Sequence, residues 1–176
     1  MKKMLLFVSI LVAFSCGSAF AHGYDSGQVS YQGEHGQGSG GKSEQMRGLH
    51  IAIKGKMAAI RQNQREINRL RLNLDDEIRQ SKILIGDLRK DPASLNASRI
   101  NALKQTMERI TQAQQVLSTT DGAMQRKNGD LKFAKSSKKA ETFSQVMDDI
   151  ISIQETRINA LSELVSSLNV LNDQLE

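Results

Sequence analysis

A glycine-rich octapeptide near the start of the chain has the residue types that bind a nucleotide phosphate. Residues 36–43 read GQGSGGKS and fit the pattern G-x-x-x-x-G-K-[ST], in which the glycines, the lysine and the magnesium-side hydroxyl are Gly36, Gly41, Lys42 and Ser43. Such a loop works because it joins a buried strand to a helix, so that its backbone amides are held around the phosphates. The preceding residues, QVSYQGEH, have too few apolar side chains for a buried strand. We therefore expect no nucleotide binding.

The other reactive side chains form no catalytic or metal-binding pattern. The three histidines, His22, His35 and His50, all lie toward the N-terminal end, far from the acidic runs 75–77 and 148–149. Neighbouring carboxylates on a helix point in different directions, so each run is expected to be a solvated face. The sequence predicts no enzyme, no cofactor and no metal site.

The first residues have the features of an export signal. Lys2 and Lys3 precede an apolar run at 4–14, which is too short to span a bilayer comfortably, and the small-x-small site Ala19-Phe20-Ala21 follows. We interpret residues 1–21 as a signal peptide that is removed during export. The mature protein is then expected in the periplasm or outside the cell.

The single cysteine leaves an alternative open. A lipoprotein would be cut before Cys16 and anchored through a lipid on that residue. Phe14 fits a lipoprotein cleavage site poorly, whereas the Ala-x-Ala site fits a signal peptidase well. Cleavage after Ala21 would leave a mature chain without a thiol.

Residues 22–45 are expected to form a disordered tail. Seven of these 24 residues are glycine and Val29 is the one aliphatic residue, so the segment cannot bury enough apolar surface to offset the entropy of ordering it.

From Met46 onward, apolar residues recur at alternating steps of four and three, the pattern of a helix packed along its length against other helices. This first stripe is Ile53, Met57, Ile60, Gln64, Ile67, Arg71, Leu74, Ile78, Ser81, Ile85 and Leu88. It predicts a helix over 46–89, which ends before Asp91-Pro92 because the residue before a proline is pushed out of helical geometry. Ser94 is the predicted N-cap of the next helix.

Two further stripes predict two further long helices. The second stripe is Ile100, Leu103, Met107, Ile110, Gln114, Leu117, Asp121, Met124, Asn128 and Leu131, and the third is Met147, Ile151, Gln154, Ile158, Leu161, Val165, Leu168, Asn172 and Leu175. They predict helices over 94–134 and 138–175 with a turn at 135–137. A break at Asn128-Gly129 is the alternative, because this dipeptide is a turn signal.

Short connections make successive helices antiparallel. The sequence therefore predicts an all-α fold, an elongated, coiled-coil-like up-down-up bundle of three long helices over 46–176. Because three stripes of similar length can cover one another, little apolar surface should remain exposed. The polar stripe residues are expected to fix the register of the helices; they are Gln64, Arg71, Gln114, Asp121 and Gln154.

Basic side chains are concentrated at one predicted end, where the start of the first helix meets the turn between the second and third. The chain carries 24 Lys and Arg against 19 Asp and Glu. If this end has a function, the partners predicted for it are lipid head groups or an anionic envelope polymer; nucleic acid is not predicted, because the aromatic residues that stack on bases are absent. The predicted contacts are Arg47, Lys54, Lys56, Arg61, Arg126, Lys127, Lys132, Lys135, Lys138 and Lys139. The favoured interpretation of these charges is a self-compensating bundle, in which the acidic start of the third helix pairs with the first, and contact with an anionic surface is the alternative.

The final helix carries the pattern Ile-x-x-Ile-Gln-x-x-Arg-Ile-x-x-Leu over residues 150–161. Together with RINALKQTMERITQAQ and AKSSKKAETFSQVMDDIISIQETRINALSEL, it resembles a loose group of exported, all-helical bacterial proteins of unknown function. That resemblance covers about 46–175 and implies export and a helical fold, without an activity. ITQAQ at 110–114 also resembles the Leu-Thr-x-x-Gln motif of Spy-type periplasmic chaperones.

These observations favour a non-enzymatic, exported cell-envelope protein that acts as a helical scaffold or interaction module. It would meet a protein partner, or another copy of itself, through its helical faces. A periplasmic chaperone-like binder of unfolded clients is the alternative. The chaperone hypothesis requires an exposed apolar patch, whereas the scaffold hypothesis requires apolar stripes that helices cover.

Overall fold

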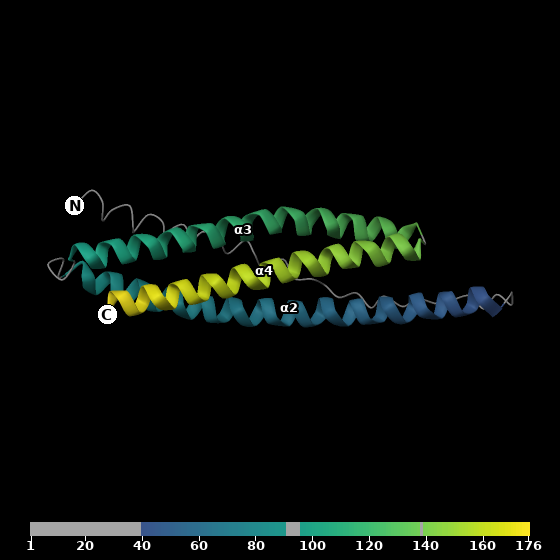
Figure 1. Ribbon diagram of the computed structural model, residues 1–176, viewed down its shortest axis with the longest axis horizontal. Coiled ribbons are helices and arrows are strands. Elements are labelled where there is room, and N and C mark those ends of the chain that lie inside the picture. Colours follow the sequence, from purple (N-terminus) through teal and green to yellow (C-terminus); the bar gives the residue numbers. More distant parts are fainter. Residues whose placement is uncertain (1–39, 91–95, 138) are drawn as a thin grey trace. The chain divides into compact units, whose positions relative to one another are not determined.

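The computed structural model describes residues 40–90, 96–137 and 139–176, and the regular structure in these ranges is entirely helical (Figure 1). Helix α2 spans Gly40–Leu88, α3 spans Ala97–Ser136 and α4 spans Ala140–Leu175. The prediction of three long helices packed in a bundle is confirmed. The predicted signal peptide at 1–21 and residues 22–39 of the predicted tail lie outside the described residues.

Helix α2 begins six residues earlier than the stripe predicted. The last part of the segment assigned to the tail, residues 40–45, is helical and includes Lys42 and Ser43. Extending a helix fixes one residue for each hydrogen bond gained, so a helix that has formed can continue into polar sequence with no apolar stripe. The apolar pattern therefore predicts the part of a helix that packs against its neighbours, and the helix can begin before that part.

Helix α3 begins later than predicted, because Asn96 is its N-cap. The backbone of Asn96 is extended, and its Oδ1 accepts a hydrogen bond of 2.8 Å from the backbone N–H of Arg99. Ser94, the predicted cap, lies outside the described residues. Asn and Ser cap helices about equally well, so the sequence could not choose between them.

Helix α3 continues through Asn128-Gly129 without a break, so that alternative is excluded. A glycine in a helix costs about 1 kcal/mol relative to alanine. Side chains on the C-terminal side of the dipeptide, Leu131 and Ala134, pack into an apolar cluster that holds this part of α3 in place. The turn falls between Ser136 and Ala140, close to the predicted 135–137.

Helix α4 is the central element of the bundle. Its backbone packs closely against both α2 and α3, whereas α2 and α3 share almost no close backbone contact with each other (Figure 1). Within the described ranges, α4 has more buried side chains than α2 and α3 together. α4 is also the most apolar of the three helices, and therefore gains most from being covered on two sides.

Contacts between the helices establish their directions. Residues near the start and the end of α2 contact the start and the end of α4 respectively, so these two helices are parallel. Helix α3 is antiparallel to both, since its last turns contact the start of α4 and its first turn contacts the end. The contacts are Lys56–Asp148, Ser81–Asn172, Lys127–Asp149 and Arg99–Gln174. This is the predicted up-down-up topology.

Two apolar clusters join all three helices. The first lies beside the α3–α4 turn and contains the buried residues Ile53, Ala134, Phe143 and Met147. The second lies further along the bundle and contains Ile67, Leu70 and Leu161, with Leu117 of α3 packed against it. Because α2 meets the first turns of α4 at the first cluster, its residues before Leu49 extend past the α3–α4 turn (Figure 1).

The expectation that the three stripes cover one another is wrong for α2. Most of its stripe is only half-buried, and Leu72 and Ile83 on the same helix are 68% and 61% exposed. The half-buried stripe residues with apolar side chains are Met57, Ile60, Leu74, Ile78, Ile85 and Leu88. The reason is the central position of α4: α3 packs on α4 and leaves α2 with one close neighbour instead of two.

The central role of α4 predicts which leucine is needed for stability. Leu164 of α4 is 1% exposed, so Leu164→Ala should lower the free energy of unfolding by about 2–5 kcal/mol, the usual cost of a core cavity. The same change at the exposed Leu72 should cost less than about 0.5 kcal/mol. Urea denaturation followed by circular dichroism measures both, and similar losses would contradict the assignment of α4 as the centre.

Candidate functional site

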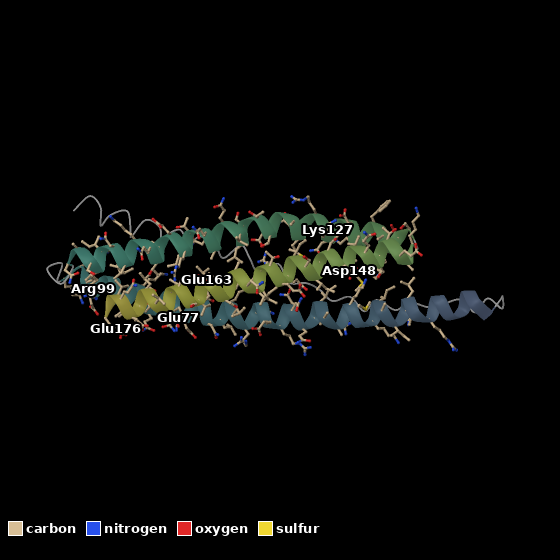
Figure 2. The ribbon with its side chains drawn as sticks, in the orientation of Figure 1. Glu77, Arg99, Lys127, Asp148, Glu163 and Glu176 are labelled. Carbon is tan, nitrogen blue, oxygen red and sulfur yellow. The ribbon has the colours of Figure 1, made fainter. Side chains whose placement is uncertain are left out.

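The two predicted basic blocks lie at the same end of the bundle. Ile53, within the first block, packs with Ala134 and Phe143, which flank the α3–α4 turn. Figure 2 shows Lys127 and Asp148 toward this end of the three helices. Lys138 lies outside the described residues, so nine of the ten predicted contacts can be placed.

Lys56 is held inside the bundle by α4. Its Nζ lies 2.6 Å from Asp148 Oδ2 and donates to the Ser144 Oγ at 2.7 Å and to the Ser144 carbonyl oxygen at 3.2 Å. The Lys56 side chain is 23% exposed. An ammonium group with three acceptors around it has no donor left for an external anion, and Lys56 is therefore a link between α2 and α4.

Lys127 is engaged in the same way by two carboxylates. Its Nζ lies 2.9 Å from Asp149 Oδ2 on α4 and 3.3 Å from Asp130 Oδ2 on its own helix. The hydrogen bond to Asp149, and then the one to Asp130, raise the pKa of Lys127 above its ordinary value. Lys127 links α3 to α4, as Lys56 links α2 to α4.

The self-compensating arrangement is therefore partly present. Of the acidic residues at the start of α4, Asp148 and Asp149 each neutralise one lysine on a neighbouring helix. Glu141 and Glu155 form no ion pair with any described residue. α4 thus pairs with both flanking helices rather than with the first alone.

The other seven placed residues are exposed, and none of them forms an ion pair within the described part of the chain. We call them the exposed basic surface: Arg47, Lys54, Arg61, Arg126, Lys132, Lys135 and Lys139. The three on α2 are seven residues apart and so follow one line along that helix. Two of the ten predicted residues are internal links, and these seven remain available to an external partner.

A second polar group lies in the middle of the bundle and takes one residue from each helix. Arg157 of α4 donates from Nη1 to Oδ1 of Asp121 on α3, and the Arg157 side chain is only 7% exposed. Burial lowers the pKa of Arg71 on α2 below its ordinary value, and the nearby charge of Arg157 lowers it further. The charges of Arg157 and Asp121 thus both act on Arg71, at one level of the bundle.

The stripes identified only part of this central layer. They predicted Arg71 and Asp121 as residues that fix the register, but they did not include Arg157, the partner of Asp121. A spacing signal was available: Arg157 follows the buried Gln154 by three residues, and residues three apart share a helix face.

A third polar group joins α2 and α4 near the opposite end. Ser81 is fully buried, and its Oγ donates to Asn172 Oδ1 at 2.6 Å. Asn172 Nδ2 donates in turn to Glu77 Oε2 at 2.7 Å. Because each buried polar atom needs this partner, a slip of α4 along α2 would leave both side chains unsatisfied.

The glutamines of the stripes behave differently from the prediction. Gln64 donates to Asn68 within its own helix, so this contact does not set the register. Gln154 is 2% exposed, and its Oε1 has no hydrogen-bond partner among the described protein groups, as is also true of Asn63 Nδ2. Asn63 and Gln154 lie at the same level of the parallel α2–α4 pair, between the Lys56–Asp148 contact and the cluster of Leu70.

No group of three or more His, Cys, Asp or Glu side chains in the described ranges is placed to hold a metal ion. Lys42 and Ser43 lie at the start of α2, and the described part of the chain has no strand on which a phosphate-binding loop could rest. A groove of about 390 Å³ between α3 and α4 is lined by small and polar side chains, with no histidine or cysteine.

None of the three described helices combines the length and apolar character needed to cross a membrane. No protein-family model, curated protein or solved structure matches this chain.

The central ionic layer predicts an unequal effect of two charge removals. Asp121→Asn should lower the free energy of unfolding by about 2–4 kcal/mol, because it leaves Arg157 buried without a carboxylate. Asp76→Asn is the control, since Asp76 and its partner Arg79 are both about three-quarters exposed and 3.8 Å apart; it should cost less than about 1 kcal/mol. Denaturant titration compares them, and equal losses would show that the central layer has no special role.

Proposed function

We propose that this chain is a non-enzymatic, exported cell-envelope protein that acts as a helical scaffold and meets an anionic surface through its basic end. The observation that supports this is the exposed basic surface, whose seven side chains find no ion pair within the described residues while Asp148 and Asp149 are used by other lysines. A set of like charges held on rigid helices attracts an anionic partner. Lipid head groups and an anionic envelope polymer share this chemistry.

Export is supported by the sequence alone. The basic residues 2–3, the apolar run 4–14 and the Ala19-Phe20-Ala21 site have the order of a signal peptide, with a lipid anchor at Cys16 as the minor alternative. The scaffold part of the proposal is supported by the large apolar side chains that α2 leaves exposed, Ile51, Leu72 and Ile83. Such side chains are suited to a helical partner or to a second copy of the chain.

The proposal predicts salt-dependent binding to vesicles that contain anionic lipid. Replacing Lys132, Lys135 and Lys139 by Gln should weaken binding about a hundredfold, since each basic residue near an anionic bilayer contributes about 1 kcal/mol. Binding of the unchanged protein should also fall steeply between low and physiological salt. Co-sedimentation with vesicles, at both salt concentrations, measures these effects.

A matched control removes three charges from the opposite end of the bundle. Arg89, Lys90 and Lys104 are exposed there, and their replacement by Gln gives the same net charge as the first variant. This control should retain binding. If both variants lose binding equally, the protein responds to net charge alone and the assignment of the basic end is wrong.

A chaperone-like binder of unfolded clients is the second candidate, and the exposed apolar residues of α2 favour it. Leu72 and Ile83 are eleven residues apart, which places them three turns apart on one face. The charged residues Asp76 and Arg79 lie between them, so the two do not form a continuous apolar patch. For this reason we place the chaperone second.

An aggregation assay separates the two candidates. As a scaffold, the protein should not suppress the aggregation of a reduced, unfolded client when the two are equimolar. Suppression by the unchanged protein that disappears in the double variant Leu72→Ser, Ile83→Ser would instead favour the chaperone. Circular dichroism of the double variant checks that its helices are intact.

A further inference from the structure

Phe133 is the most exposed of the large apolar side chains in the described part of the chain. It lies in the last turns of α3 and is 72% exposed. The neighbouring Leu131 and Ala134 supply the contacts between this part of α3 and the core, so Phe133 is not needed for packing. An aromatic ring on a helix surface costs solubility without adding stability, and its position therefore calls for a role outside the bundle.

Cationic side chains lie near this ring in the sequence, on the last turns of α3 and at the start of α4. Lys132 precedes it directly, Arg126 lies one heptad earlier on the same line of α3, and Lys135 follows in the last turn. Lys139 stands at the start of α4, across the turn. We call this set the turn surface: Arg126, Lys132, Phe133, Lys135 and Lys139, all of them exposed.

Carboxylates near the turn surface leave its charge positive. Asp130 is held by Lys127, at 3.3 Å. Glu141, in the first turn of α4, is exposed and pairs with no described residue. The turn surface thus has four cations, and the carboxylate of Glu141 is the one nearby negative charge that is not already paired within the described residues.

An exposed apolar ring close to cationic residues favours an anionic lipid bilayer over a soluble anionic polymer as the partner. A soluble anionic polymer offers charge alone, and a ring beside it stays in water. An anionic bilayer offers phosphate groups at its surface and an apolar region just below them. Aromatic side chains favour that boundary, and lysine and arginine can bury their aliphatic stems there while their charges stay among the head groups.

We propose that the turn surface docks on an anionic lipid bilayer, with Phe133 inserted below the head groups and the four cations on the phosphates. This inference rests on the proposed function and names its partner. The contact is peripheral: one ring and four charges give reversible adsorption that is sensitive to salt.

The absence of tryptophan from the whole chain gives a direct test. Phe133→Trp places a single fluorophore on the turn surface, and Ile83→Trp places one on α2 near the other end, at a position that is 61% exposed. With vesicles of phosphatidylglycerol and phosphatidylcholine, the emission of the Phe133→Trp variant should shift to the blue and be quenched by brominated lipid. The Ile83→Trp variant should show neither effect, and vesicles of phosphatidylcholine alone should leave both spectra unchanged.

A second measurement tests the energetic role of the ring. Phe133→Ser should weaken binding to the anionic vesicles about tenfold. Its circular dichroism and thermal midpoint should be unchanged, since the side chain is exposed.

The outcomes separate the inference from the function on which it rests. Salt-dependent binding without a blue shift in the Phe133→Trp variant would overturn the insertion and leave a purely electrostatic contact. A blue shift in both tryptophan variants would mean non-specific adsorption and would overturn the assigned surface. Failure of every variant to bind anionic vesicles, at low salt as well, would overturn the inference together with the lipid branch of the proposed function.

Discussion

The burial of α4 between two helices is the interaction on which the other features of this bundle depend. It is the most apolar helix, and hydrophobic burial is non-directional and roughly proportional to the area removed from water, so the lowest free energy places α4 where two neighbours cover it. The same choice leaves α2 with one close neighbour, and that is why most of its stripe is only partly buried and Leu72 and Ile83 face solvent.

Apolar burial alone does not fix how the helices slide along one another, because a heptad stripe fits its neighbour again after seven residues. Polar groups at the surfaces of α4 remove that freedom. Arg157 meets Asp121 on α3, and Asn172 meets Ser81 on α2. A slip would leave the buried side chains of Arg157, Asn172 and Ser81 unsatisfied. The ion pairs Lys56–Asp148 and Lys127–Asp149, near the α3–α4 turn, also oppose a slip of the helices. They contribute less free energy, since their side chains are more exposed.

The central helix also determines which charges remain for an external partner. Only the carboxylates of α4 that face a neighbouring helix can neutralise it, and these are Asp148 and Asp149. The seven residues of the exposed basic surface stay in water. The exposed basic surface is thus a consequence of packing geometry as well as of composition, and Phe133 of α3 is exposed at the same end.

The sequence by itself determined the helical class, the three long helices, their order and the position of the turn before Ala140, because these depend on local periodicity and turn chemistry. It also determined which residues could carry the charge. Only the tertiary structure decided that α4 is central, that Lys56 and Lys127 are internal links, that Arg157 completes the central layer and that Asn96 caps α3. The physical reason is that periodicity gives the face a helix buries, whereas neighbours, ion pairs and exposure depend on distances between segments far apart in the chain.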